Sequence, residues 1–189
     1  FDGSNSNRPA HEHFEPARPI SFCVPEQAYL ALAIRFANGL LPCHDGGLKN
    51  HSTRGSSVNV LLLNPGQMGE QVGLAARHSA SAVYWSSEGR GAATAARATR
   101  AGLTDAGNLS DALGKADLVL SVVPPHAAQA TAKQVAGHGF SGIYVDLNAV
   151  SPGTGKRVHD LVCAAGATYV DGGIIGPPPK ARGEARMYL

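Results

Sequence analysis

The stretch from Val58 to Gly69, VNVLLLNPGQMG, constrains the fold more than any other part of the chain. Its first half is a short and nearly continuous apolar run, which is typical of a parallel strand buried on both faces. Residues 64–66 break the run, and a helical period begins at Met68. A buried strand, a tight turn and a helix in this order predict a turn that binds the pyrophosphate of a dinucleotide, because the amides and the dipole of a helix start attract anions.

The glycine pattern of this turn departs from the usual one at its first position. Dinucleotide-binding turns carry three glycines in the spacing GxGxxG, and the corresponding residues here are Asn64, Gly66 and Gly69. Asparagine is one of the few other residues that adopt left-handed backbone angles, so we expect the turn to persist. Gly66 would let phosphates approach the main chain, and Gly69 would let the helix lie close to the strand. Pro65 has no amide to donate. An ordinary strand-to-helix turn is the alternative interpretation.

Strands and helices alternate along the rest of the chain. After the first helix, strands are expected at 81–85, 103–106, 118–123, 143–146 and 168–170. Helices are expected at 91–101, after a cap at Asn108 or Ser110, and from the pair Ser151–Pro152. A rigid segment rich in glycine and proline, DGGIIGPPP, follows the sixth strand. This alternation predicts an α/β fold with a doubly wound, Rossmann-like parallel sheet.

The residues that end the second expected strand bear on the choice of dinucleotide. They lie about 20 residues past the glycine turn, where such folds bind the adenosine ribose. Ser86 comes first, and Glu88 and Arg90 follow in the loop. No carboxylate ends the strand itself, and a hydroxyl group with an arginine suits a 2′-phosphate, so we predict NADP as the cofactor. NAD is the alternative, because Glu88 could bind the ribose and Arg90 could be a solvated loop charge.

Composition excludes several other classes of protein. Of the 189 residues 43% are hydrophobic and 16% are charged, which is enough apolar content for a globular core. A net charge of +2 is too small to indicate a nucleic-acid-binding surface. No apolar run approaches the roughly 20 residues that cross a bilayer. The 3 distant cysteines predict a reducing compartment, and hence a cytoplasmic location, rather than a disulfide framework. The histidines and cysteines near the N-terminus match no zinc pattern, so no metal site is predicted.

Residues 1–57 differ from the remainder. Their first part is polar and contains several prolines without any period, which predicts a largely disordered N-terminal extension with a single amphipathic helix at 27–41. Residues 58–189 form the predicted dinucleotide-binding domain. The sequence opens on Phe1 and stops at Leu189, directly after the start of an expected strand at Met187. We therefore expect a chain that is cut at both ends.

Four motifs follow one another in residues 58–189: NPGQMG, VVPP, DLNAVSP and DGGIIGPPP. Together they resemble the NAD(P)-binding domain of the 6-phosphogluconate / 3-hydroxyisobutyrate dehydrogenase superfamily, and within it a subgroup with a divergent C-terminal domain of unknown function. The usual forms there are a GLGxMG turn, a Leu-Pro loop, D-x-S-T-x-x-P and DAPVSGG. The resemblance implies hydride transfer between a nicotinamide and a hydroxyl or carbonyl carbon of a small-molecule substrate. It also implies a C-terminal helical domain, missing from this chain, that usually forms a homodimer.

The resemblance further implies a set of cofactor-binding residues. The turn would surround the pyrophosphate, and Ser86 and Arg90 would meet the adenosine ribose or its phosphate. Val123 and Pro124 would lie alongside the nicotinamide ribose, and Asn148 would lie near the nicotinamide. The turn residues are Asn64, Pro65, Gly66, Gln67, Met68 and Gly69.

Two departures from the family pattern leave the catalytic residues unassigned. The family's catalytic lysine would lie beyond Leu189, and the position of its substrate-binding serine is Ile175, which cannot form a side-chain hydrogen bond. A non-catalytic dinucleotide-binding module, or an inactive truncated product, is therefore the alternative function. Binding of another adenosine ligand, such as S-adenosylmethionine, at the same turn is a third hypothesis.

Overall fold

The computed structural model of the chain describes residues 58–180 and 184–189. The predicted extension at residues 1–57, with the helix expected at 27–41, lies outside these residues. The strand, turn and helix predicted at the start of the domain are present as β1 (Asn59–Leu63) and α2 (Gln67–Ala76). Four of the five residues of β1 are buried, and they alternate between the two faces of the sheet, so that both faces must be covered.

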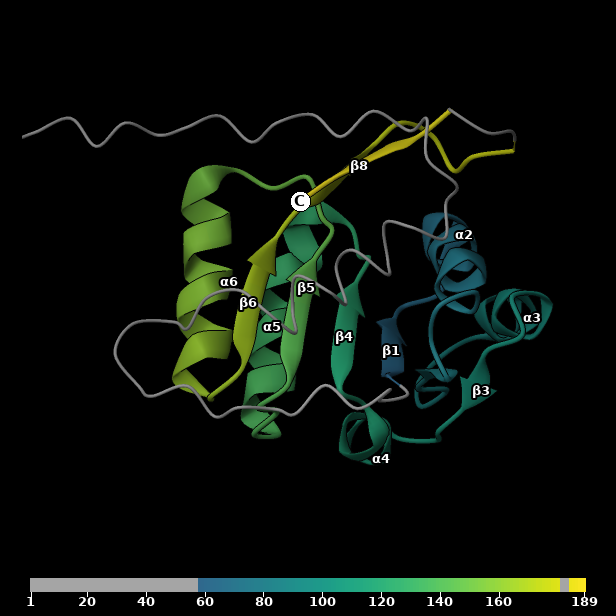
Figure 1. Cartoon of the computed structure of the whole chain (residues 1–189), viewed down its shortest axis with the longest axis horizontal. Helices are drawn as coiled ribbons and strands as arrows, with labels where there is room; N and C mark the ends of the chain where they lie inside the picture. Colours follow the sequence, from purple (N-terminus) through teal and green to yellow (C-terminus); the bar gives the residue numbers. More distant parts are fainter. Residues whose placement is uncertain (1–57, 181–183) are drawn as a thin grey trace, which may run out of the picture.

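Six parallel strands form the main sheet in the order β3-β2-β1-β4-β5-β6 (Figure 1). This is the strand order of dinucleotide-binding domains, in which the order of the strands reverses between β1 and β4 and leaves a crevice at their carboxyl ends. The predicted α/β class and doubly wound sheet are thus confirmed. The other strands are β2 (Ala82–Trp85), β3 (Thr104–Asp105), β4 (Leu118–Ser121), β5 (Ile143–Asp146) and β6 (Thr168–Asp171).

Helices cover both faces of this sheet. The helices α2 and α3 (Ala92–Arg100) pack on one face, against a core that includes Val60 and Leu62. The other face carries α4 (Leu109–Lys115), α5 (Ala128–Gly137) and α6 (Pro152–Ala164), which pack against Leu61, Leu63 and Tyr144. A short 3-10 turn, η1 (Pro125–Ala127), precedes α5.

The predicted helix starts are confirmed by their caps. The Asn108 side chain accepts a hydrogen bond of 2.8 Å from the Asp111 amide at the start of α4. The Ser151 hydroxyl accepts one of 3.3 Å from the Thr154 amide at the start of α6, with Pro152 as the first helical residue.

Two features at the carboxyl ends of the strands differ from the prediction. The strand expected to reach Val123 ends at Ser121, because the Val123 amide donates instead to the side chain of Asn148, at 2.7 Å. The glycine- and proline-rich segment contains a strand that was not predicted, β7 (Gly173–Ile175), which pairs antiparallel with β8 (Arg186–Tyr188). The strand expected to start near Met187 is confirmed by β8. None of the helices in 58–180 is long and apolar enough to cross a membrane.

Candidate cofactor-binding site

The turn between β1 and α2 has the conformation that its sequence predicts. Asn64 has a φ of +62°, in the left-handed region, and no other non-glycine residue of the described segments has a positive φ. The Gly66 amide donates to the Asn64 carbonyl oxygen at 2.7 Å, which closes the turn tightly. Asparagine therefore takes the backbone conformation that glycine usually provides at this position.

The first turn of α2 offers free donors beside this bend. The Glu70 amide donates to the Gly66 carbonyl at 2.8 Å, which is the first bond of the helical pattern. Among the described residues, the amides of residues 67–69 have no hydrogen-bond acceptor, and no side chain caps the helix. Three unpaired amides at the positive end of a helix dipole form a binding site for an anionic group.

The two glycines of the turn have different surroundings. A Cβ atom added at Gly66 would meet only the Asn64 carbonyl oxygen, 3.9 Å away, so the space in front of this residue is open. A Cβ added at Gly69 would lie 2.8 Å from the same oxygen and 3.5 Å from its carbon. These distances agree with the two roles expected from the sequence, which are access to the main chain at Gly66 and close approach of helix to strand at Gly69.

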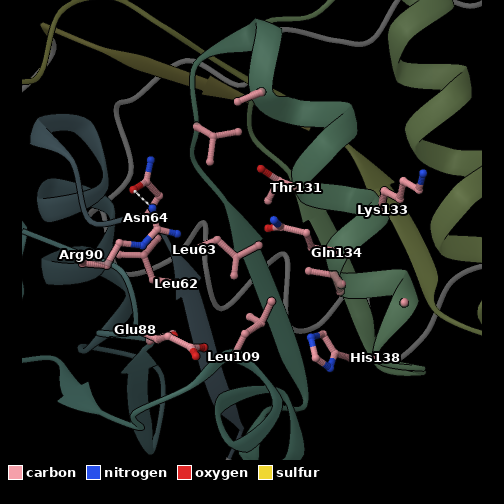
Figure 2. Close-up of a pocket in the computed structure, with 15 residues that line it drawn as sticks. Leu62, Leu63, Asn64, Glu88, Arg90, Leu109, Thr131, Lys133, Gln134 and His138 are labelled. Carbon is pink, nitrogen blue, oxygen red and sulfur yellow. Dashed lines mark hydrogen bonds between the residues drawn. The ribbon is translucent and has the colours of Figure 1, made fainter.

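A pocket of about 680 Å³ begins at the turn and runs along the α4 and α5 side of the sheet (Figure 2). It brings together four residues predicted for the cofactor: Asn64, Ser86, Arg90 and Val123. The remaining predicted residues, 65–69, Pro124 and Asn148, do not line it. Helix α5 supplies lining residues that the sequence did not indicate, including Thr131, Gln134 and His138.

The loop after β2 presents both of the groups that bear on cofactor choice. Arg90 Nη1 donates to Asn64 Oδ1 at 3.0 Å, so the arginine lies against the turn. The Ser86 hydroxyl donates to the Gly107 carbonyl at 2.9 Å and keeps its lone pairs for a further donor. Glu88 also lines the pocket. The site therefore holds one cation and one carboxylate where an adenosine ribose would be expected.

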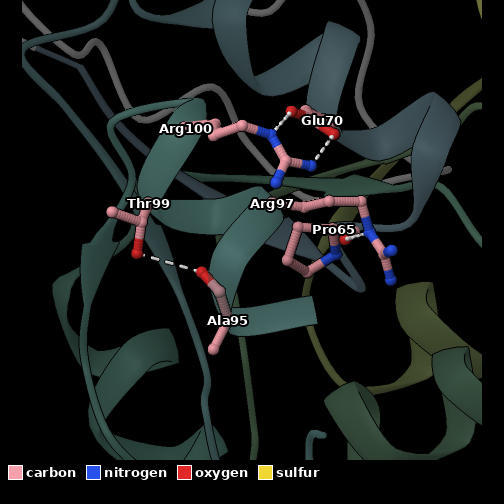
Figure 3. Close-up of polar contacts among 6 residues, drawn as sticks. All are labelled: Pro65, Glu70, Ala95, Arg97, Thr99 and Arg100. Carbon is pink, nitrogen blue, oxygen red and sulfur yellow. Dashed lines mark hydrogen bonds and ion pairs between the residues drawn. The ribbon is translucent and has the colours of Figure 1, made fainter. Parts of the chain in front are cut away.

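Helix α3 adds two arginines that were not predicted from the sequence (Figure 3). Arg97 Nε donates to the Pro65 carbonyl at 3.0 Å, which fixes the turn from outside. Arg100 forms two bonds, of 2.8 and 3.0 Å, with the carboxylate of Glu70 in the first turn of α2. This pairing offsets a negative charge that would otherwise repel an anion at the helix start. The spacing of three residues, which places Arg97 and Arg100 on one side of a helix, was the available signal.

Asn148 packs against the loop that follows β4 and is hydrogen-bonded to it. Its side chain is buried at 4% exposure, and its Oδ1 accepts the Val123 amide. Its Nδ2 donates to Ser121 Oγ, at 3.0 Å, and to Asp146 Oδ1. Both amide hydrogens are thus bound within the protein, and Asn148 holds the backbone of the loop in place. The structure brings Asn148 and Val123 together, as expected for two residues of one site, while Pro124 is exposed beside them.

A buried carboxyl group completes this network. The Asp146 side chain is fully buried, and its Oδ1 accepts from the backbone amide of Asn148 at 3.0 Å. Its Oδ2 has no partner within the described residues. Burial raises the pKa of Asp146, although the bonds from Asn148 act in the opposite direction. Protonation of this group is therefore easier in the folded domain than in the unfolded chain.

Comparison with known proteins gives matches by structure alone. No protein-family model matches the chain, and no curated protein sequence matches it. A solved conserved protein of unknown function, described as structurally similar to 3-hydroxyacid dehydrogenases, is 29% identical with a TM-score of 0.57 over 64% of this chain and 45% of that one. A 3-hydroxyisobutyrate dehydrogenase of Mycobacterium tuberculosis with L-serine is 17% identical, with a TM-score of 0.58 over 65% and 42%. A variant imine reductase of Myxococcus stipitatus in complex with NAD⁺ is 19% identical, with a TM-score of 0.55 over 65% and 42%.

The chain spans less than half of the length of each of the three proteins. The described residues therefore have the fold of these proteins, and the match to the protein described as similar to 3-hydroxyacid dehydrogenases supports the resemblance to the 6-phosphogluconate / 3-hydroxyisobutyrate dehydrogenase superfamily.

Proposed function

We propose that this domain binds a nicotinamide dinucleotide, NADP(H) in preference to NAD(H), and acts as the cofactor half of an oxidoreductase. The observation that carries the proposal is the turn itself. It has a left-handed bend at Asn64, open space at Gly66 and unpaired amides at residues 67–69, all next to a pocket that contains Arg90. A pyrophosphate would accept hydrogen bonds from these amides, and a 2′-phosphate would bind Arg90. Ser86 would donate to that phosphate by releasing the Gly107 carbonyl, its acceptor in the structure.

The remaining predicted residues would position the nicotinamide end. Val123 and Pro124 would lie along the nicotinamide ribose, and Asn148 would hold their loop through its bond to the Val123 amide. The bound cofactor would supply hydride transfer to or from a hydroxyl or carbonyl carbon. The contribution of this chain would be orientation of the cofactor, and no residue described here is assigned to proton transfer.

The substrate, partners and location of the whole protein belong to the same proposal. A small-molecule substrate would bind between this domain and a following helical domain that also forms a homodimer, in the cytoplasm. One observation favours a non-catalytic module instead: Ile175, at the position of the family's substrate serine, has a purely apolar side chain that is 56% exposed.

Calorimetric titration of the chain with NADPH, NADH and S-adenosylmethionine tests this function. The expected result is saturable binding of both dinucleotides, tighter for NADPH, with no displacement of NADPH by excess S-adenosylmethionine. A folded sample, verified by circular dichroism, that binds neither dinucleotide would contradict the proposal. Dinucleotide binding by the whole protein without turnover of any hydroxy acid, ketone or imine would favour the non-catalytic module.

A further inference from the structure

Asn64 has a side-chain contact that the glycine usual at its position cannot form. Its φ of +62° suits glycine, so the backbone alone gives no reason for an asparagine here. Its side-chain oxygen, however, accepts a hydrogen bond of 3.0 Å from Arg90, which lies 26 residues further along the chain. We propose that Asn64 is a specificity-determining residue that favours NADPH over NADH by holding Arg90 at the mouth of the pocket. This inference rests on the proposed function.

The position of the pair supports a role at the adenosine end of the cofactor. Strands β1 and β2 are parallel neighbours, with Leu61 opposite Tyr84, so the loops at their carboxyl ends lie side by side. Asn64 follows β1, Arg90 follows β2, and both line the same pocket (Figure 2). The end of the second strand is where a dinucleotide-binding domain meets the adenosine ribose.

The bond to Asn64 restrains the Arg90 side chain, which packing does not hold in place, although the Arg90 amide donates to the Ser87 carbonyl at 3.0 Å. The residue is exposed, and it lies between Gly89, with a φ of +67°, and Gly91. Neither glycine has a heavy atom within 4 Å of an added Cβ, so packing does not fix this loop. The bond to Asn64 uses one donor of the guanidinium and leaves the others to bind a phosphate. An arginine that is already in place loses less conformational freedom when the phosphate binds.

The carboxylate of Glu88 makes the hydrogen bond between Arg90 and Asn64 important for the choice between NADPH and NADH. Glu88 lines the same pocket as Arg90, and it would repel a 2′-phosphate while accepting hydrogen bonds from an unphosphorylated ribose. With Arg90 held against the turn, a positive charge lies close to the phosphate position. When Arg90 is released, the influence of Glu88 increases and the preference is expected to move toward NADH.

The test is a double-mutant cycle in the intact chain, with dissociation constants for NADPH and NADH measured by calorimetry. Asn64→Gly restores the usual glycine and is expected to keep the melting temperature and to change the dissociation constant for NADH less than that for NADPH. It should weaken NADPH binding by about 3- to 30-fold, as expected for partial loss of a charge-assisted contact. Arg90→Ala should weaken NADPH binding at least as much. The double variant should bind NADPH with the same dissociation constant as Arg90→Ala alone, because both changes remove the same hydrogen bond between Asn64 and Arg90.

Several outcomes would overturn the inference while leaving the proposed function intact. They are an unchanged ratio of the two dissociation constants in Asn64→Gly, an equal loss for both dinucleotides, or additive effects in the double variant. Asn64→Asp is a second test, because its carboxylate would still accept from Arg90 but would repel a 2′-phosphate; the preference for NADPH should fall, and an unchanged preference would contradict the inference. Failure of the wild-type chain to bind either dinucleotide would instead refute the proposed function, and with it this inference.

Discussion

Alanine substitutions at the two glycines of the turn separate phosphate binding from folding. Gly66→Ala adds a methyl group in open space, since the nearest heavy atom to its Cβ would be 3.9 Å away, and the φ of −73° is allowed for alanine. The change should leave the free energy of unfolding the same or raise it by about 0.4–1 kcal/mol, because alanine restricts the unfolded chain. The methyl group would, however, stand where a phosphate must approach the amides of residues 67–69. Loss of one hydrogen bond to a charged group costs about 1.5–3 kcal/mol, or about 10- to 150-fold in the dissociation constant.

Gly69→Ala is expected to act on folding instead. Its Cβ would lie 2.8 Å from the carbonyl oxygen of Asn64, and a backbone atom cannot move aside as a flexible side chain can. Forcing the helix away from the strand costs about 1–3 kcal/mol. The higher helix propensity of alanine stabilises the helix by about 1 kcal/mol. We therefore expect the free energy of unfolding to fall by up to about 2 kcal/mol. NADPH binding should weaken together with stability, because the whole turn is displaced.

Urea unfolding and calorimetric titration with NADPH measure the two quantities on the same samples. Gly114→Ala, near the end of α4, is the matched control: its Cβ would meet no heavy atom within 4 Å, and it should not change the dissociation constant. Wild-type affinity in a stable Gly66→Ala variant would contradict phosphate binding at this turn, which would then be an ordinary connection between a strand and a helix.

Two further predictions concern charged groups around the site. Since burial raises the pKa of Asp146 above its ordinary value of 3.8, this group stabilises the fold most below pH 3.8, and that contribution is lost as the pH rises through the raised pKa. The free energy of unfolding of Asp146→Asn, measured with urea, should therefore rise relative to that of the wild type as the pH increases from about 4 to 7. A difference between the two free energies that does not vary with pH would contradict this prediction. Arg100→Ala leaves Glu70 unpaired at the helix start, so NADPH binding should weaken about 2- to 5-fold in low salt. Some loss of stability is also expected, because the Glu70 side chain is only 14% exposed although that of Arg100 is 60% exposed. Glu70→Gln in the Arg100→Ala background should restore binding, and failure to do so would show that repulsion by Glu70 is not the cause.

Much of the fold could be predicted from residues that determine their own local conformation. The run of apolar residues in β1 required cover on both faces, and the caps at Asn108 and Ser151 marked helix starts correctly. The left-handed bend at Asn64 followed from the backbone preference of asparagine alone. Such features depend on interactions within a few residues, which a sequence displays directly.

Features that depend on distant partners were harder to predict. Strand β7 was interpreted as a rigid loop because its glycines and flanking prolines disfavour strands; its pairing with β8, eleven residues later, stabilises it. Strand β4 ends at Ser121 although apolar residues continue to Val123, because a buried side chain on another loop captures the Val123 amide. Neither the hairpin partner nor the buried acceptor could be identified from the segment itself.

The contact between Asn64 and Arg90 depends partly on local sequence and partly on distant partners. It joins residues 26 positions apart, so local pattern alone does not reveal it. Once β1 and β2 are predicted to be parallel neighbours, however, their carboxyl ends must meet, and the polar residues that follow each strand become adjacent. In the sequence, the asparagine that replaces the first glycine and the arginine that suggests NADP belong to two separate segments. The strand order brings the two residues together, so the asparagine that departs from the glycine motif is a candidate determinant of cofactor choice.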